Sequence, residues 1–350
     1  MKRGYQSFPL LLKRIINYLA VQLQYRLATP YVRGHPYVLI IDTINICNLK
    51  CPLCPTGVDM PGRPKGRMDF SLFKRIIDVL GDYALTLVLY NWGEPLLNKN
   101  IYSMIEYAKQ RSIKTIVSSN LNILNEKDAE TLVKSGLDRL IVSLDGTKSE
   151  TYEEYRKGGN YHRVIANIEL LVRKKAEMKS SKPKVTWQFL VFKHNVQDIP
   201  EIKRTAKQLR VDGVDIFGAY LGGPRQTPYI RDEGTKELAS KWLFPDRRFK
   251  GQFDYFSNPN YLNRNRCYFL WKTLTINWDG SISPCCCVYD PSTDFGNIKE
   301  EEFHQIWNNN LFRSSRALFG KKKMSLPKVH TICDSCKVFK KPCVEKVGED

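Results

Sequence analysis

Ten cysteines in a chain of 350 residues are grouped in a way that favours a metal over disulfides. Cys47, Cys51 and Cys54 lie close together, and the other seven begin at Cys267. The 212 residues between Cys54 and Cys267 contain no cysteine. Small disulfide scaffolds spread their cysteines through a short chain, so this clustering indicates metal ligands, with disulfides as the alternative.

The spacing Cys47-x3-Cys51-x2-Cys54 could hold three irons of a cubane iron–sulfur cluster. One iron would then have no protein ligand and could bind a chelating molecule, whereas four-cysteine ferredoxin runs have other spacings and no such open iron. A structural zinc site is the alternative interpretation of these three cysteines.

The segment TINICNLKCPLCPTG (43–57) resembles the signature of the radical S-adenosylmethionine (radical SAM) enzymes. This resemblance implies a [4Fe–4S] cluster whose open iron binds the amino and carboxylate groups of SAM. The segment LYNWGEPLLN (89–98) resembles the family's GGEP motif, which implies that Gly93 and Glu94 contact the SAM amino group. Trp92 replaces the first glycine of that motif, and Leu53 stands where many members carry an aromatic residue beside the adenine.

Four more residues follow from the same resemblance. The segment IVSLDG (141–146) and the later Arg156 resemble the positions that contact the ribose and carboxylate, with Ser143 and Arg156 as the candidates. We also expect Ser119 and Asn120, at the end of a predicted strand, to line the SAM cavity.

The C-terminal cysteines follow the pattern Cys267-x12-Gly280-x4-Cys285, then Cys333-x2-Cys336 and Cys343. This pattern resembles the SPASM and twitch extensions of the radical SAM superfamily, which hold auxiliary iron–sulfur clusters. The resemblance implies one auxiliary [4Fe–4S] cluster, ligated by Cys267, Cys285, Cys333 and Cys336. Cys286, Cys287 and Cys343 are left over, one thiolate short of a second full cluster.

Three consecutive cysteines in PCCCVYD (284–290) cannot easily serve one metal together, because neighbouring side chains of an extended chain point to opposite faces. If Cys285 is a ligand, Cys286 or Cys287 could donate a hydrogen atom to a substrate radical, as in a radical epimerase. The alternative is that both are buried small apolar residues. If neither thiol donates, the auxiliary cluster could accept an electron, which describes a dehydrogenase, with Asp290 as the candidate base.

The elements that must position these residues alternate between strand and helix from residue 37 onward. β-Branched and aromatic runs predict strands at 37–44, 84–90, 112–119, 137–145, 184–192 and 212–220. Helical patterns lie between them at 69–80, 101–110, 126–136, 161–177 and 198–210. Such alternation predicts a parallel α/β sheet, either doubly wound or curled into an incomplete barrel. The resemblance implies the latter, a partial (β/α)6 TIM-like barrel with a small C-terminal iron–sulfur module.

We therefore expect an N-terminal amphipathic helical segment at 1–36, the barrel at 37–235 and the auxiliary-cluster module at 236–350. A linker is expected near 222–229, where the strand–helix alternation ends. The module contains a hairpin at 274–284 that turns at Asp279–Gly280, followed by a helical stretch at 300–320. The N-terminal helix places Leu12, Ile15, Ile16, Leu19 and Leu23 on one side. Packing on the main domain and anchoring at a membrane surface are the two interpretations of that side.

The formal net charge of +19 suggests an anionic partner. Compact members of the superfamily with one auxiliary cluster act on sugars and cyclitols, and the basic stretch GRPKGR (62–67) could meet a phosphate. We therefore expect a radical SAM dehydrogenase or epimerase acting on a small sugar- or cyclitol-like substrate, phosphate- or lipid-linked, and supplied with electrons by a flavodoxin or ferredoxin. Relatives that modify peptides usually carry a leader-binding domain before the barrel, and only 36 residues precede the first strand here, so we expect a ribosomal peptide only as an alternative.

Further alternatives are a tRNA-modifying enzyme, or a non-catalytic iron–sulfur scaffold or electron carrier. Nucleic acid is not the expected partner, because no RNA-binding module or stacking-aromatic motif is recognisable. Iron–sulfur clusters need reducing surroundings, so the expected location is the cytoplasm, with contact at the inner membrane surface if the N-terminal helix binds lipid.

Overall fold

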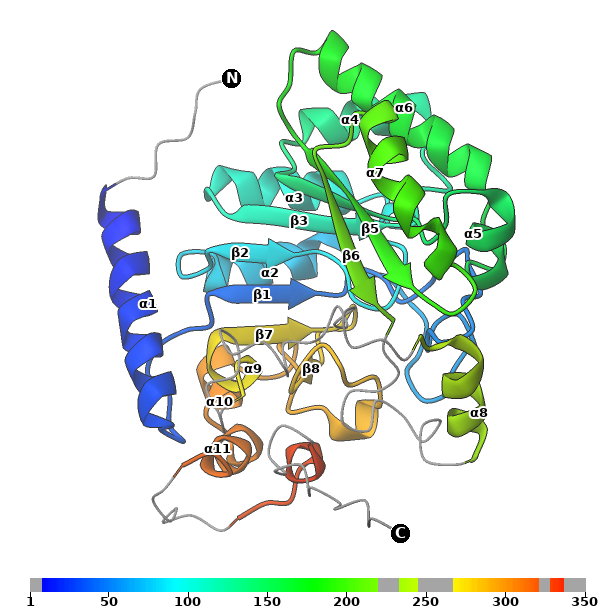
Figure 1. The fold of residues 1–350 in the computed structure, drawn as a ribbon. Coiled ribbons are helices and arrows are strands. Elements are labelled where there is room, and N and C mark those ends of the chain that lie inside the picture. Colours follow the sequence, from blue (N-terminus) through cyan, green and yellow to red (C-terminus); the bar gives the residue numbers. More distant parts are fainter. Residues whose placement is uncertain (1–7, 220–232, 245–266, 321–327, 337–350) are drawn as a thin grey trace.

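A sheet of eight strands forms the centre of the molecule in a computed structural model that describes residues 8–219, 233–244, 267–320 and 328–336. The strand order is β6-β5-β4-β3-β2-β1-β7-β8, so the first six strands follow one another along the sheet (Figure 1). These six are parallel and lie within the six predicted strand ranges: β1 Val38–Ile41, β2 Thr86–Val88, β3 Lys114–Ser119, β4 Arg139–Ser143, β5 Lys184–Val191 and β6 Gly213–Gly218. The predicted α/β fold is confirmed, and it is a partial TIM-like barrel.

The helices that connect the parallel strands also agree with the sequence patterns. They are α2 Phe70–Leu80, α3 Ile101–Gln110, α4 Glu126–Lys134, α6 Tyr161–Glu177 and α7 Ile199–Gln208. Polar caps fix their starts: the Asp69 carboxylate accepts a hydrogen bond from the Leu72 amide at 2.8 Å, and Asn125 and Asn160 cap α4 and α6 in the same way. The pattern did not predict α5 (Ser149–Tyr155) or the short 3-10 turns η1 (Pro95–Leu97) and η2 (Val196–Asp198).

Hydrophobic residues at helical spacing pack each connecting helix on the outer face of the sheet. In α2 the buried residues are Leu72, Phe73, Ile76, Ile77 and Leu80. Along the strands, alternate residues such as Leu140 and Val142 face this helical layer. The other face lines the barrel interior, and its polar residues gather where the strands end, which is where a site can form.

The C-terminal region shares the barrel sheet, which the prediction of a separate module did not include. It contains α8 (Glu233–Trp242), α9 (Phe269–Lys272), β7 (Thr273–Ile276), β8 (Ile282–Ser283), η5 (Pro291–Thr293), α10 (Phe303–Trp307), α11 (Asn310–Ala317) and η6 (Ile332–Ser335). Strand β7 pairs in parallel with β1, from Val38 opposite Thr273 to Ile41 opposite Ile276. The predicted hairpin is confirmed, because β7 and β8 are antiparallel and Gly280 in their turn has a φ of +89°.

The domain limits stay a prediction. The expected boundary between residues 235 and 236 falls inside α8. The helical stretch predicted at 300–320 consists of α10 and α11, which separate where the Asn309 side chain accepts a hydrogen bond from the Phe312 amide at 3.0 Å. The linker predicted at 222–229 and Cys343 lie outside the described residues.

The N-terminal helix α1 (Phe8–Leu27) lies across the amino ends of the strands (Figure 1). It packs on the barrel through Arg14, Asn17, Val21 and Tyr25. Packing of α1 on the main domain is confirmed, but its apolar side does not provide that packing, because Leu12, Ile15, Ile16, Leu19 and Leu23 are all exposed. No helix in the described part of the chain is long and apolar enough to cross a membrane.

Candidate functional site

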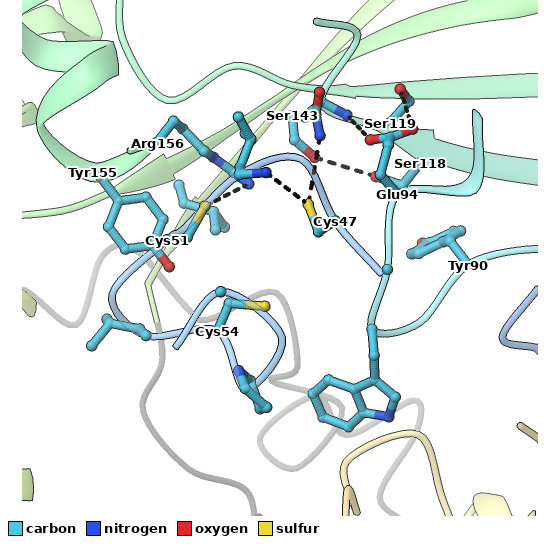
Figure 2. Close-up of a pocket in the computed structure, with 18 of the residues that line it drawn as sticks. Cys47, Cys51, Cys54, Tyr90, Glu94, Ser118, Ser119, Ser143, Tyr155 and Arg156 are labelled. Carbon is cyan, nitrogen blue, oxygen red and sulfur yellow. Dashed lines mark hydrogen bonds between the residues drawn. The ribbon is translucent and has the colours of Figure 1, made fainter. Parts of the chain in front are cut away.

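A cavity of about 250 Å³ lies at the carboxyl ends of the parallel strands. Cys47, Cys51 and Cys54, in the loop after β1, lie on its wall. Figure 2 shows their side chains with those of Glu94 and Arg156 around this cavity. Cavity walls also come from the ends of β2 to β5 and from the C-terminal region.

The loop that carries the three cysteines is tightly wound. The Cys54 amide donates to the Cys51 carbonyl at 3.1 Å, and the Val58 amide donates to the Cys54 carbonyl at 3.0 Å. A Cβ atom on Gly57 would lie 2.4 Å from the Cys51 carbonyl oxygen, so this position requires glycine. These contacts fix the backbone of the segment CPLCPTG (51–57), and the backbone in turn orients the Cys51 and Cys54 side chains.

The sulfurs of two of these cysteines are surrounded by hydrogen-bond donors. The Leu49 amide and the Asn120 side-chain amide lie 3.4 and 3.8 Å from Cys47 Sγ, and the Arg156 guanidinium lies 3.9 Å from Cys51 Sγ. Burial raises the pKa of Cys47 to about 11 and that of Cys51 to about 12, so both are neutral thiols until a cation replaces their protons. Donors aimed at sulfur suit anionic, cluster-bound thiolates, so these residues fit a [4Fe–4S] cluster.

Gly93 and Glu94 connect the end of β2 to the cluster loop. A Cβ atom on Gly93 would lie 1.9 Å from the Ile44 carbonyl oxygen, so only glycine allows this approach. The next amide, that of Glu94, donates to the Ile46 carbonyl at 2.9 Å. This pairing brings the predicted motif directly beside the cysteines.

The Glu94 carboxylate lies buried at the ends of β2 and β3. It accepts hydrogen bonds from Ser119 Oγ at 2.8 Å, from the Asn120 amide at 2.8 Å and from the Leu96 amide at 3.1 Å. Burial raises its pKa. The Glu94 carboxylate therefore links the ends of β2 and β3. Ser119 both donates to that carboxylate and lines the cavity.

All six residues predicted to bind the cofactor line the same cavity: Gly93, Glu94, Ser119, Asn120, Ser143 and Arg156. Arg156 is held by an ion pair with the buried Asp145 carboxylate at 2.6 Å. Ser143 Oγ lies 3.3 Å from Ser118 Oγ. The structure thus brings these residues together, while their individual roles stay predictions.

Two aromatic side chains that the sequence analysis missed lie beside Leu53. The rings of Tyr155 and Phe192 have centroids 4.1 Å apart, and both line the cavity. They belong to one apolar cluster with Leu49 and Cys51, against which Leu53 packs. Two aromatic rings therefore lie near Leu53, one from α5 and one just after β5, and no local sequence signal predicts them.

Neutral polar side chains that were also missed form another part of the wall: Tyr90, Asn91, Ser118 and Gln188. Except for Asn91, they occupy alternate, interior-facing positions in or just after the strands. The period-two alternation of the strands could have predicted these three. The pKa of Tyr90 is raised to about 12 by burial and by the nearby Cys286.

Trp92, the departure from the family motif, also lines the cavity and contacts the C-terminal region. Its amide donates to the Asp42 carboxylate at 3.2 Å, and its ring meets Tyr289 edge to face with centroids 5.3 Å apart. Burial raises the pKa of Asp42 to about 7. The tryptophan therefore attaches the motif to the C-terminal region.

The four predicted auxiliary ligands come together in a second cavity of about 20 Å³. Cys267, Cys285, Cys333 and Cys336 line it with the apolar side chains of Phe269, Leu270, Val288 and Ile332. Burial and the charges of Cys336, Cys333 and Cys285 raise the pKa of Cys267. Four thiols that line one apolar cavity suit an auxiliary iron–sulfur cluster. Among the described residues, no three His, Cys, Asp or Glu side chains converge on a position for a single metal ion.

The three consecutive cysteines have different surroundings. Cys285 lines the auxiliary cavity and Cys286 lines the large cavity. Cys287 is buried, and a hydrogen bond with it raises the pKa of Cys285. The Asn91 side chain hydrogen-bonds at both its nitrogen and its oxygen when its amide nitrogen faces the Cys286 carbonyl. It then donates to that carbonyl at 3.2 Å and accepts from Trp92 Nε1 at 2.8 Å.

Asp290 does not line the cavity, contrary to the expectation that it acts there as a base. Its carboxylate caps η5, accepting from the Ser292 amide at 2.9 Å and from Ser292 Oγ at 2.8 Å. The basic stretch at 62–67 also differs from expectation. Arg63 is buried and bonded to the C-terminal region, and Lys65 pairs with Asp59, so these two cations are engaged within the chain.

Comparisons with known proteins agree with this geometry. Residues 41–206 match the model of the radical SAM superfamily, and residues 267–337 match the SPASM iron–sulfur cluster-binding domain. The AdoMet-dependent heme synthase of Methanosarcina barkeri is 24% identical over 77% of this chain and 82% of its own length. The PqqA peptide cyclase of Gluconobacter oxydans is 21% identical over 80% of each chain. The Streptococcus suis SuiB structure bound to S-adenosylmethionine has a TM-score of 0.62 at 17% identity, over 92% of this chain and 75% of SuiB.

Proposed function

This chain belongs to the radical SAM superfamily and carries a C-terminal SPASM domain, and from that premise we propose that it is an epimerase acting on a small polyhydroxylated substrate. Its cofactors are a [4Fe–4S] cluster that binds SAM and auxiliary iron–sulfur, for which we propose a single [4Fe–4S] cluster. We further propose that the enzyme works in the reducing cytoplasm, with an electron donor of the ferredoxin or flavodoxin class.

When bound and reduced, the first cluster and SAM supply a 5′-deoxyadenosyl radical that removes a hydrogen atom from the substrate. The chain holds this group through the thiolates of Cys47, Cys51 and Cys54. We assign Glu94, Ser119, Asn120, Ser143 and Arg156 to SAM, because all five line the cavity beside those thiols. Tyr155 and Phe192 offer an aromatic surface on which a purine can stack.

The position of the Cys286 thiol is the observation that supports epimerisation. Its side chain lines the cavity that also contains the three cluster cysteines, and its chain neighbour Cys285 lines the auxiliary cavity. The Cys286 S–H bond breaks as its hydrogen atom forms a new C–H bond on the substrate radical, which inverts that carbon if the attack comes from the opposite face. One electron from the reducing donor and one proton then return the sulfur to the thiol.

Epimerisation is favoured over dehydrogenation by the position of Asp290. Oxidation of a carbinol radical to a ketone needs a base for the hydroxyl proton. Asp290 was the candidate, but its carboxylate caps η5 outside the cavity. Among the described residues that line the cavity, Glu94 is the only carboxylate and is assigned to SAM, whereas Cys286 offers a thiol.

The substrate class is inferred from the neutral polar wall. Tyr90, Asn91, Ser118 and Gln188 are hydroxyl and amide groups, which suit the hydroxyls of a sugar or cyclitol. Arg63 is occupied by Asp294, so the basic stretch gives little support for a phosphate-linked form of the substrate.

A peptide is the second candidate substrate. The PqqA peptide cyclase matches over 80% of both chains, and the SuiB structure bound to its precursor peptide has a TM-score of 0.61. Hydroxyl and amide side chains also bind the polar groups of a peptide backbone, and the second experiment below decides between the two substrates.

The first experiment compares the anaerobic wild type with the variant Cys47→Ala/Cys51→Ala/Cys54→Ala. We expect about eight irons in the wild type and about four in the variant, with loss of 5′-deoxyadenosine formation from SAM and a strong reductant. A fully loaded wild type that never forms the nucleoside would overturn catalysis and favour an iron–sulfur scaffold.

The second experiment is turnover in D2O with sugar, cyclitol and peptide substrates. Cys286→Ala is expected to form 5′-deoxyadenosine without placing solvent deuterium in an inverted product. Cys287→Ala is the matched control and should behave as the wild type. Wild-type deuterium incorporation by Cys286→Ala would disprove the role of this thiol.

A further inference from the structure

The side of α1 that points away from the barrel is an unusually apolar surface. Of the eleven large hydrophobic residues exposed in the described part of the chain, nine lie on α1 and a tenth is Tyr31, just after it. Ile16, Leu19 and Leu23 are 58%, 60% and 57% exposed. We call the following set the apolar face: Leu12, Ile15, Ile16, Leu19, Leu23 and Leu27. A contiguous exposed patch of this kind marks an interaction surface.

The opposite side of α1 is fixed to the barrel, so the apolar face is held outward. The buried Arg14 guanidinium donates to the carbonyls of Gly81 at 2.9 Å and Arg111 at 2.8 Å, just beyond the ends of α2 and α3. The Asn17 side chain donates to the His35 carbonyl at 3.0 Å and accepts from the His35 amide at 2.8 Å. These bonds satisfy carbonyls that the helix ends leave unpaired. Burying the apolar face against the barrel would break them.

Charge indicates which partner fits this face. Residues 1–41 contain no aspartate or glutamate, but they contain Lys2, Arg3, Lys13, Arg14, Arg26 and Arg33. Of these, Lys13 pairs with Asp82, whereas Arg26 and Arg33 are exposed. An apolar helix side flanked by cations fits the interface of a bilayer that contains anionic lipids.

We propose that α1 docks this protein on an anionic membrane surface. The helix lies in the plane of the interface, with the apolar face among the acyl chains and the flanking cations at the lipid phosphates. Tyr18 and Tyr31, which are 38% and 53% exposed, are residues of the type that favours this depth.

Docking in this way directs the site away from the bilayer. The carbonyls held by Arg14 come just before β2 and β3, so α1 lies at the amino ends of the strands, whereas the cysteine cavity lies at their carboxyl ends (Figure 1). A head group attached to a lipid beneath α1 would therefore face the wrong end of the barrel. The membrane sets the location of the enzyme and does not deliver a lipid-linked substrate, so the inference does not rest on the proposed reaction.

The test is co-sedimentation of the iron-loaded protein with phosphatidylcholine vesicles, with and without phosphatidylglycerol, at low and high salt. The variant Ile16→Gln/Leu19→Gln/Leu23→Gln removes the centre of the apolar face. Val79→Gln is the control, because Val79 is 39% exposed but lies on α2 and does not belong to the apolar face. We expect salt-sensitive binding to the phosphatidylglycerol vesicles, a loss of roughly hundredfold in affinity for the triple variant and wild-type binding for the control.

Iron content and thermal unfolding of both variants show whether the fold is intact, and 5′-deoxyadenosine formation in the absence of lipid should be unchanged. The proposal is overturned if phosphatidylglycerol vesicles do not bind at low salt, or if the triple variant binds like the wild type. It is also overturned if light scattering shows a wild-type dimer that the triple variant abolishes, because a second copy would then cover the face.

Discussion

The Arg63 guanidinium donates hydrogen bonds to both carboxylate oxygens of Asp294, at 2.8 and 2.9 Å. The same side chain donates to the Tyr289 carbonyl at 3.0 Å and to Ser281 Oγ at 2.8 Å. The Arg63 side chain is fully buried and that of Asp294 is 12% exposed. This pair fastens the segment after the first cysteine loop to the segment that carries Cys285 to Cys287.

Asp294→Ala should lower the free energy of unfolding by about 3–5 kcal/mol, because it leaves a buried guanidinium without its counter-charge. Anaerobic urea unfolding followed by circular dichroism measures this loss. The exposed Lys134–Glu130 pair provides the control, and Glu130→Ala should change stability by less than about 1 kcal/mol. Equal losses in the two variants would show that the Arg63 pair has no special role.

Gly93→Ala should nearly abolish 5′-deoxyadenosine formation, by at least about hundredfold, because a 1 Å displacement at a reacting site can have that effect. The added Cβ would lie 1.9 Å from the Ile44 carbonyl oxygen, so the motif must move away from the cluster loop and take Glu94 with it. The measurement is nucleoside formation per bound iron, by chromatography.

Gly213→Ala is the control for this substitution. A Cβ atom there meets its nearest neighbour, Thr186, at 4.0 Å, and Gly213 has no positive φ. Its activity should stay within about twofold of the wild type. Wild-type activity of Gly93→Ala would mean that the tight approach to Ile44 is not needed.

The barrel could be predicted from the sequence because its signals are local. Strand runs and helix caps such as Asp69 depend on neighbouring residues, and the cysteine spacing fixes which thiols can share a cluster. The pairing of β7 with β1 joins segments more than 200 residues apart, and no periodicity encodes it.

Three cases show which features a sequence pattern cannot predict. Adjacent cysteines are equivalent in the pattern, and only the fold directs Cys286 to the large cavity and buries Cys287. The basic stretch around Arg63 predicts solvated or phosphate-binding cations, because the pattern cannot show that its carboxylate partner Asp294 lies 231 positions further along the chain. The pattern leaves two interpretations of the side of α1 around Leu19, because it cannot show that Arg14 on the other side bonds four backbone carbonyls.

Cys336→Ala should lose about four of the expected eight irons while keeping the first cluster, because Cys336 lines the auxiliary cavity. Cys287→Ala should keep all of them, since the Cys287 side chain is buried in a small apolar cluster with Ile40 and Phe269 and does not line the auxiliary cavity. Iron analysis and electron paramagnetic resonance of the reduced proteins distinguish the two variants. Equal iron loss in both would shift the ligand assignment to Cys287.

Stability should fall as the pH is lowered below about 6.5, because of His35. Its ring stacks on Tyr83 with centroids 3.7 Å apart, and burial, together with the charge of Lys13, lowers its pKa from 6.5 to about 4. The unfolded chain therefore binds the proton first, so the stabilisation by neutral His35 is complete above pH 6.5 and is lost as the pH falls towards 4. Allowing for its partial exposure, the loss between about pH 7.5 and pH 5 should be about 1–2 kcal/mol.

His35→Phe keeps an aromatic ring against Tyr83 and removes the titration. Urea unfolding of both proteins at the two pH values isolates the effect of His35, because groups common to both cancel in the difference. The same pH dependence in both would show that His35 is already exposed to solvent in the folded protein. A flatter profile in the variant would show that the pH dependence comes from His35, whose backbone is bonded to Asn17 of α1.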